Sequence, residues 1–312
     1  MVADFLFIII GVVLVLWGAD RLTEGASALA RRMRVPEIVI GLTIVAAGTS
    51  APELFVSMAS ALKGTPDMAV GNVVGSNIFN TLLIVGCSAL VAPMVIAPST
   101  VKKDVPFAVI ASLLLLGAIL VGSDISRIDG VVLLGGFAVF MAYTFRVAYQ
   151  KKDDTEAETS AKSASIWLNV IFVLAGLACL VFGSDLFVES ASSVARQLDV
   201  SEGVIGLTIV AGGTSLPELA TSVVAARKGQ SAIAIGNVIG SNVFNILLIL
   251  GVTATISPMP VEGITVVDLM VMLVSVLMVW AFAYTKYTVA RWEGAVLVAV
   301  FLGYISWLLY NL

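Results

Sequence analysis

Residues 41–86 read GLTIVAAGTSAPELFVSMASALKGTPDMAVGNVVGSNIFNTLLIVG, and residues 206–251 read GLTIVAGGTSLPELATSVVAARKGQSAIAIGNVIGSNVFNILLILG. The two stretches align without a gap at an offset of 165, with 29 of 46 positions identical. The same offset carries Gly18-Ala19-Asp20 onto Gly183-Ser184-Asp185. Repetition at one fixed offset indicates a chain of two homologous halves, which we place at residues 1–149 and 166–312.

The composition places both halves in a membrane. Of the 312 residues, 59% are hydrophobic and 12% are charged, and the mean hydropathy is +1.06. A soluble domain carries about 25% charged residues. Several apolar runs reach the roughly 20 residues that cross about 30 Å of hydrocarbon as a helix. The sequence therefore predicts an all-α polytopic membrane protein and argues against a soluble enzyme.

Hydropathy predicts ten transmembrane helices, five in each half. They cover residues 4–30, 36–62, 67–92, 104–122 and 128–148, then 166–195, 201–227, 232–257, 264–285 and 292–310. Between the halves, residues 150–165 form the only long polar stretch, which we predict to be a linker loop. Because each half has an odd number of spans, the second half enters the membrane from the opposite side, and the repeat is inverted.

The distribution of basic residues predicts the orientation in the membrane. If the amino terminus is outside, fourteen Lys and Arg residues fall at inside loops and helix ends. Only Lys63, Arg127 and Arg196 then fall outside. Because cytoplasmic loops carry the excess of basic residues, we expect both termini outside the cell membrane (the inner, or cytoplasmic, membrane) and a cytoplasmic 150–165 loop.

Residue usage narrows the chemistry. The chain has no histidine, which excludes His-based catalytic triads and the usual zinc sites. Cys87 and Cys179 lie in apolar surroundings without CxxC spacing, so we expect two packing residues. Nothing in the sequence indicates a nucleophile, a cofactor or a nucleic-acid partner. An enzyme is therefore not expected.

Each half carries a polar cluster around a glutamate inside an apolar span: GTSAPE at 48–53 and GTSLPE at 213–218. A carboxylate near the bilayer centre costs about 2.5–3.5 kcal/mol, so Glu53 and Glu218 are predicted to face a polar cavity and to be functional. Ser50 and Thr49 precede Glu53 by three and four residues and can share its helical face. Pro52 has no N–H, which predicts a broken helix with freed carbonyl oxygens.

A second cluster follows in each half, GNVVGSNIFN at 71–80 and GNVIGSNVFN at 236–245. Asn72, Ser76 and Asn80 lie at i, i+4 and i+8, on one helical face, and Asn237, Ser241 and Asn245 repeat this stripe. The symmetry predicts four broken helices meeting at mid-depth. Asn72, Asn77, Asn237 and Asn242 suit either interhelical hydrogen bonding or ion ligation, and both interpretations stay open.

The candidate ligands are all oxygens, from carboxylates, amides, hydroxyls and the backbone. This is the preference of hard cations such as Ca²⁺, which takes six to eight oxygens. One Ca²⁺ balances the two glutamates. Another cation or protons must replace the departing ion, since an empty site leaves two buried carboxylates without a counter-charge. This requirement favours exchange over leak.

The paired GTSxPE and GNVxGSNxFN motifs resemble the two repeats of the cation/calcium exchanger superfamily, in particular prokaryotic sodium/calcium exchangers. The resemblance covers nearly the whole chain and implies Na⁺/Ca²⁺ antiport by alternating access, with the first helix of each half sliding across the core. It further implies that Glu53 and Glu218 bind both ions alternately and that Asn80 and Asn245 occupy the central positions between them. Hydroxyls for the sodium sites would come from Ser50, Ser215, Ser76 and Ser241. The calcium and outer sodium shells would be completed by Thr49, Thr214 and the carbonyls of Ala46 and Ala211.

One departure from the family pattern concerns the coupling ratio. Well-known sodium/calcium exchangers carry an Asp at one central position, where this chain has Asn80 and Asn245. The local formal charge is then −2, which leads us to expect that fewer Na⁺ are held at once than in three-to-one exchange.

Two other functions compete with this interpretation. A Ca²⁺/H⁺ antiporter of the same fold needs only the carboxylates, and the serine hydroxyls favour Na⁺ without deciding the question. A cation channel would need a ring of charges rather than one enclosed pair. Asp20, Glu24, Asp185 and Glu189 lie where long first helices reach an interface, and we expect them to be solvated or structural. The transport unit is expected to be a monomer in the lipid bilayer.

Overall fold

The computed structural model describes residues 2–122, 124–152, 166–199, 209, 211–261 and 263–310, and nearly all of them are helical. The first half contains α1 (Val2–Met33), α2 (Glu37–Ile40), η1 (Gly41–Val45), α3 (Ala46–Thr49), α4 (Ala51–Leu62), α5 (Pro66–Ile78), η2 (Phe79–Ile84), α6 (Val85–Val91), β1 (Met94–Val95), η3 (Thr100–Asp104), α7 (Val105–Gly122), β2 (Asp124–Ile125) and α8 (Arg127–Lys152). The second contains α9 (Ile166–Gln197), α11 (Ala211–Thr214), α12 (Leu216–Arg227), α13 (Ser231–Val243), η5 (Phe244–Leu250), α14 (Gly251–Ile256), β3 (Met259–Pro260), α15 (Val266–Lys286), β4 (Thr288–Val289) and α16 (Arg291–Tyr310). The segments labelled η are π-helical turns.

The polytopic membrane fold is confirmed, whereas the predicted number of ten spans is not reached within the described residues. In the described part of the chain, eight helices are long and apolar enough to cross a membrane. Glu37–Thr49 and Ala51–Leu62 meet at a bend of 46° and make a ninth crossing if they count as one span. The predicted span 201–227 is described only at residue 209 and from residue 211 on, as α11 and α12. Residues 153–165 of the predicted linker also lie outside the described residues.

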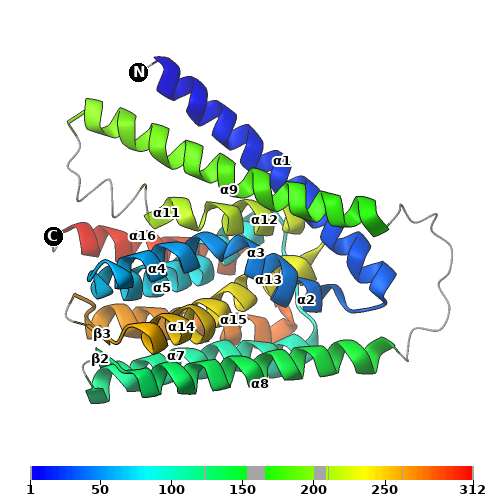
Figure 1. The fold of residues 1–312 in the computed structure, drawn as a ribbon. Coiled ribbons are helices and arrows are strands. Elements are labelled where there is room, and N and C mark those ends of the chain that lie inside the picture. Colours follow the sequence, from blue (N-terminus) through cyan, green and yellow to red (C-terminus); the bar gives the residue numbers. More distant parts are fainter. Residues whose placement is uncertain are drawn as a thin grey trace.

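The two halves are joined by short antiparallel strand pairs at both ends of the bundle. Met94 in β1 pairs with Val289 in β4, and Ile125 in β2 pairs with Met259 in β3. Because α7 leads from β1 to β2, the two pairs lie at opposite ends. Met94 and Met259 are related by the 165-residue offset, so exchanging the halves exchanges the two pairs. This is the geometry of an inverted repeat, and both chain termini lie at the same end (Figure 1).

The long helices α1 and α9 lie side by side across one face of the bundle (Figure 1). Their backbones touch at glycines. A Cβ atom at Gly18 would lie 2.7 Å from the carbonyl oxygen of Gly176, and one at Gly11 would lie 2.7 Å from that of Gly183. Any side chain at these positions would separate the helices, so α1 and α9 form one closely packed pair.

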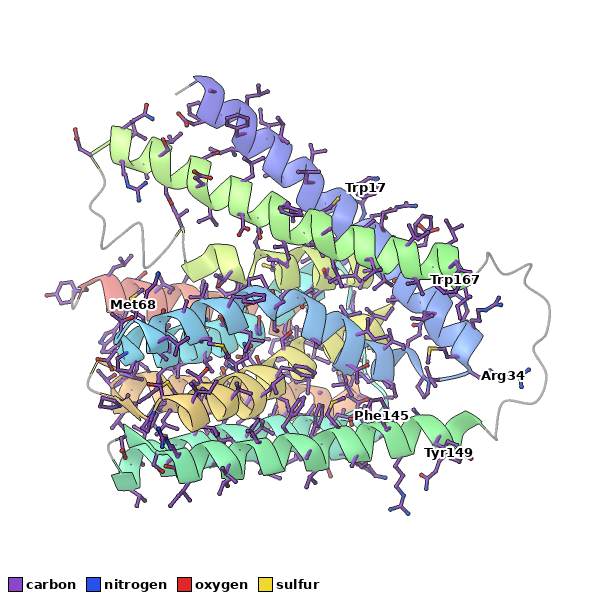
Figure 2. All side chains as sticks on the ribbon, in the orientation of Figure 1. Trp17, Arg34, Met68, Phe145, Tyr149 and Trp167 are labelled. Atoms are coloured by element: carbon purple, nitrogen blue, oxygen red, sulfur yellow. The ribbon has the colours of Figure 1, made fainter. Side chains whose placement is uncertain are left out.

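The outer surface is apolar and the polar residues lie inside. Trp17, Phe145 and Trp167, labelled in Figure 2, are 48%, 59% and 72% exposed. By contrast, 94% of the most apolar stretch of the helix Ser231–Ile256 is buried inside the bundle. An exposed apolar shell around a core that contains buried Asn, Ser, Thr and Glu is the arrangement expected in lipid. Cys87 and Cys179 are free thiols.

Candidate ion-binding site

Both glutamate-bearing helices start at a break, as the sequence predicts. Ser50 separates α3 from α4 with φ −84° and ψ 7°, and Ser215 separates α11 from α12 with φ −90° and ψ 7°. A proline stands in the first turn of each following helix, where its missing N–H costs nothing. Glu53 and Glu218 therefore lie at helix amino termini, where the helix dipole favours negative charge.

The two breaks are bonded to each other crosswise. Ser50 Oγ donates a hydrogen bond to Glu218 Oε1 at 3.0 Å, and Ser215 Oγ donates one to Glu53 Oε1 at 3.2 Å. Ser76 Oγ lies 3.2 Å from Ser215 Oγ and extends the cluster to α5. Each glutamate is thus held by the broken helix of the other half, so the structure brings the two predicted carboxyl groups together.

The pair of glutamates has no compensating charge among the described residues. Each side chain is 1% exposed, and Oε2 of each has no hydrogen-bond partner. The two carboxyl groups interact electrostatically, and neither forms an ion pair in the described part of the chain. Two buried carboxylates without a cation are costly, because neighbouring like charges repel and water is excluded. The arrangement is therefore suited to a cation placed between them.

The second cluster lies on two continuous helices, so the expectation of four broken helices is wrong. Pro66–Val91 and Ser231–Ile256 each form one uninterrupted helical segment. Neither motif contains a proline that would remove a backbone donor, so the helix continues and widens into π-helical turns at η2 and η5. Asn80 lies in η2 and Asn245 in η5. Such π turns are frequent at functional sites.

Several side-chain atoms of these helices are buried without a partner in the described structure. Asn80 Nδ2 donates to Asn242 Oδ1 at 3.1 Å, but Asn80 Oδ1 has no partner. Both amide atoms of Asn245 also lack partners, and the Ser241 hydroxyl interacts with Glu218 without forming a hydrogen bond of normal geometry. Each unsatisfied buried polar group costs about 1–3 kcal/mol. Their gathering among predicted site residues indicates groups prepared to bind something other than protein.

The structure favours hydrogen bonding over ligation for Asn72 and Asn237. Asn237 Nδ2 donates to Ser222 Oγ at 3.0 Å and to the Glu218 carbonyl at 3.4 Å. Asn72 Nδ2 makes the equivalent bonds, to Ser57 Oγ at 2.9 Å and to the Glu53 carbonyl at 3.2 Å. These asparagines thus hold each glutamate-bearing helix through the glutamate's backbone carbonyl and the serine one turn later.

Sequence reasoning missed Ser57 and Ser222. The signal was available, since a serine follows each glutamate by four residues in both halves.

Thr49 joins the two halves a second time. Its Oγ1 lies 3.0 Å from Asn237 Oδ1 and 3.1 Å from the Val45 carbonyl oxygen, and its single proton can be donated to either acceptor. The Ala46 carbonyl already accepts the Ser50 N–H at 2.9 Å, so it could reach an ion only with its second lone pair.

The matching residues of the second half are Thr214 and Ala211. Thr214 interacts with Glu53. Ala211 is described by its backbone alone, as the first residue of α11.

Comparisons with known proteins agree with this arrangement. The sequence profile described as "Sodium/calcium exchanger protein" matches residues 3–146 and 168–310. The chain is 38% identical to "Putative antiporter CaxA" of Alkalimonas amylolytica, over 97% of this chain and 98% of the relative. It is 32% identical to "Sodium/calcium exchanger MaX1" of Methanosarcina acetivorans, over 98% and 99%.

A solved structure shares the fold. The sodium-calcium exchanger NCX_Mj, soaked with 10 mM Na⁺ and 10 mM Sr²⁺, superposes with a TM-score of 0.85 at 31% identity, covering 98% of both chains. The matches extend over both halves and nearly every residue. This chain therefore belongs to the sodium/calcium exchanger protein family and is an integral membrane exchanger of the antiporter type.

Proposed function

We propose that this exchanger carries Na⁺ and Ca²⁺ in opposite directions by alternating access, at one site shared by Glu53 and Glu218. The cross-bonded glutamate pair carries the proposal, since its charge has no protein counter-ion among the described residues. The names of two relatives support the choice of ions, because MaX1 is a sodium/calcium exchanger and NCX_Mj was soaked with Na⁺ and Sr²⁺.

The Ca²⁺ ion would lie between the two carboxylates. The unpartnered Oε2 atoms of Glu53 and Glu218 supply charge, and the unpartnered amide oxygens of Asn80 and Asn245 supply neutral ligands. Ca²⁺ needs six to eight oxygens, so further ligands are required. We assign these to the hydroxyls of Thr49 and Thr214 and to the carbonyls of Ala46 and Ala211, which would also complete outer sodium shells. The hydroxyls of Ser50, Ser215, Ser76 and Ser241 are assigned to the sodium sites.

The serines suit Na⁺ because a hydroxyl can donate a hydrogen bond to a carboxylate and bind a cation through a lone pair at the same time. A hydroxyl has one proton and two lone pairs. Ser50 and Ser215 donate their protons to the glutamates, which leaves lone pairs for a cation beside the carboxylate. Competition between Na⁺ and Ca²⁺ for the same two carboxylates then couples their transport.

The charge of the site sets the proposed coupling. With asparagine at positions 80 and 245, two ionised glutamates give −2, which one Ca²⁺ or two Na⁺ neutralise. We therefore propose fewer than three Na⁺ per Ca²⁺ and a correspondingly weak dependence of exchange on membrane voltage.

The proposed topology follows from the basic residues and the inverted repeat. Residues 1–149 and 166–312 form the two five-helix repeats, and residues 150–165 form the linker between them. We propose that both termini face outward and the linker faces the cytoplasm, in the cell (inner) membrane, with one chain as the transport unit. The two segments matched by the family profile support this division of the chain.

A Ca²⁺/H⁺ antiporter is the alternative, because the serine–glutamate bonds form without Na⁺ and each carboxylate can take a proton. Ca²⁺ uptake into proteoliposomes separates the two. An outward Na⁺ gradient with pH clamped on both sides should drive uptake, whereas a pH gradient in Na⁺-free buffer should not. Uptake driven only by the pH gradient would establish the alternative.

A further inference from the structure

The two halves have equivalent charged residues at the two ends of the bundle, but they pair at only one end. The 165-residue offset relates Asp20 in α1 to Asp185 in α9, and Lys63 to Lys228. Lys63 and Lys228 are the C-cap residues of α4 and α12, the helices that begin with Glu53 and Glu218. Each lysine is followed by a glycine with positive φ, Gly64 at 78° or Gly229 at 75°, so both are placed by the same turn.

One of the equivalent ion pairs is formed. Lys228 Nζ lies 2.6 Å from Asp20 Oδ1 and also donates to the Asp20 carbonyl at 3.0 Å and to Thr23 Oγ1 at 3.2 Å. All three ammonium protons are therefore used in joining α12 to α1. Arg21 Nε donates to Asp20 Oδ2 at 3.1 Å, and Arg21 also forms an ion pair with Glu24.

The other pair is open. Lys63 and Asp185 both belong to the described residues, both are exposed, and no ion pair joins them there. The packing differs in the same sense: α1 packs against α12, but α9 makes no comparable contact with α4 in the described structure. Asn237 is 0% exposed, whereas its counterpart Asn72 is partly exposed. The bundle is thus closed at the α12 end and looser at the α4 end.

We propose that Asp20–Lys228 and Asp185–Lys63 are alternative ion pairs, each formed in one of the two states of the exchange cycle. They are positioning residues, which hold the α1/α9 pair against α12 in one state and against α4 in the other. The inference rests on the proposed alternating access. In an inverted repeat, exchanging the conformations of the two halves closes the end that was open. The same exchange breaks the Lys228 bonds and brings Asp185 to Lys63.

The sequence also explains why this state is the one observed. Thr23, which accepts a bond from Lys228, corresponds to Val188 in the second half. Arg21, which shares Asp20, corresponds to Leu186. The Asp185–Lys63 pair therefore has fewer hydrogen-bond partners, and the state that is closed at α12 is favoured.

Hydrogen–deuterium exchange of the full chain in lipid nanodiscs, in buffer free of Na⁺ and Ca²⁺, tests the proposal. Lys228→Gln should speed exchange in the last turns of α12 and slow it in the last turns of α4, since the ratio of the two states shifts by about fivefold. Asp20 keeps Arg21 as a partner, so the fold is retained. Lys103→Gln, an exposed lysine on the same predicted side, is the control and should change neither segment.

The decisive variant is Lys228→Gln combined with Lys63→Gln. Losing both pairs removes the bias, so exchange at α12 and α4 should return toward the original values. Faster exchange at α12 alone, or no reversal by the second substitution, would reduce Asp20–Lys228 to a local contact and overturn the proposal. Because no transported ion is present, these outcomes do not depend on whether Ca²⁺ and Na⁺ are the substrates.

Discussion

Ser50 Oγ donates a hydrogen bond to Glu218 Oε1 at 3.0 Å, across 168 positions of sequence and between the two halves of the chain. The equivalent bond from Ser215 to Glu53 makes the contact reciprocal. Neither half can therefore build the glutamate pair alone. Each copy of the GTSxPE motif supplies both an acid and the hydroxyl that positions the acid of the opposite copy.

Neutralising either glutamate should abolish exchange. Glu53→Gln or Glu218→Gln removes one of the two charges that would balance a bound Ca²⁺. Removing one partner from a buried pair of opposite charges costs about 3–5 kcal/mol, equivalent to a rate or affinity loss of roughly 100-fold or more. Ca²⁺ uptake into proteoliposomes measures this. Glu293→Gln is the matched control, because Glu293 is buried but only accepts the Ala290 N–H at 2.7 Å, outside the site. Full transport in both site variants would remove these residues from the ion path.

The same substitutions should stabilise the ion-free protein. Without a cation, Glu53 and Glu218 repel each other in a buried site, and an amide at either position relieves that repulsion. Thermal unfolding in a chelator-containing, Na⁺-free buffer should therefore show a higher Tm for Glu53→Gln than for the unmodified chain. Adding Ca²⁺ should raise the Tm of the unmodified chain and leave that of the variant unchanged. At a Ca²⁺ concentration of 100 times Kd, binding adds about 2.7 kcal/mol to the free energy of unfolding. A Ca²⁺ effect of equal size in both would contradict the assignment.

Restoring an acid at a central position should change the coupling. Asn245→Asp places a third carboxyl group where both amide atoms of Asn245 are unpartnered. The additional charge should admit an extra Na⁺ and make exchange more sensitive to membrane voltage. Reversal-potential measurements in liposomes should give a higher Na⁺ to Ca²⁺ ratio for the variant. A clear three-to-one ratio in the unmodified chain would disprove the proposed charge argument.

Asn237 should matter more for stability than Asn72. Asn237→Ala removes the bonds that Asn237 makes with Thr49 Oγ1 and Ser222 Oγ at a position that is 0% exposed, and lost hydrogen bonding of buried polar groups costs about 1–3 kcal/mol. Asn72 makes the equivalent bonds in a partly exposed position, where solvent can substitute. Denaturation of Asn237→Ala and Asn72→Ala in matched detergent should give the larger loss for Asn237. Equal losses would show that the two ends of the bundle are equally closed.

Much of this arrangement could be predicted because it depends on local chemistry. Pro52 and Pro217 predict the breaks at Ser50 and Ser215, since proline cannot supply an N–H to the preceding turn. A carboxylate in an apolar span predicts a polar interior, and the structure buries both glutamates at 1% exposure.

The unpredicted features depend on tertiary context. The π turns at Asn80 and Asn245 could not be predicted, because no proline or other local signal in either motif marks them. The difference between Asn72 and Asn237 could not be predicted from nearly identical motifs, because it reflects which end of the bundle is closed. Asp20 is expected from the sequence to be solvated or structural, which agrees with its partly exposed ion pair, but its partner Lys228 on a distant helix could not be predicted.

Equilibrium binding of Ca²⁺ to the purified chain at increasing Na⁺ tests the shared site most directly. If Glu53 and Glu218 bind both ions, the apparent Kd for Ca²⁺ should rise steadily with Na⁺ at constant ionic strength and pH, and Glu53→Gln should eliminate Ca²⁺ binding. A Kd for Ca²⁺ that stays constant over the same Na⁺ range, or undiminished binding in Glu53→Gln, would mean that the two ions do not compete for these carboxylates.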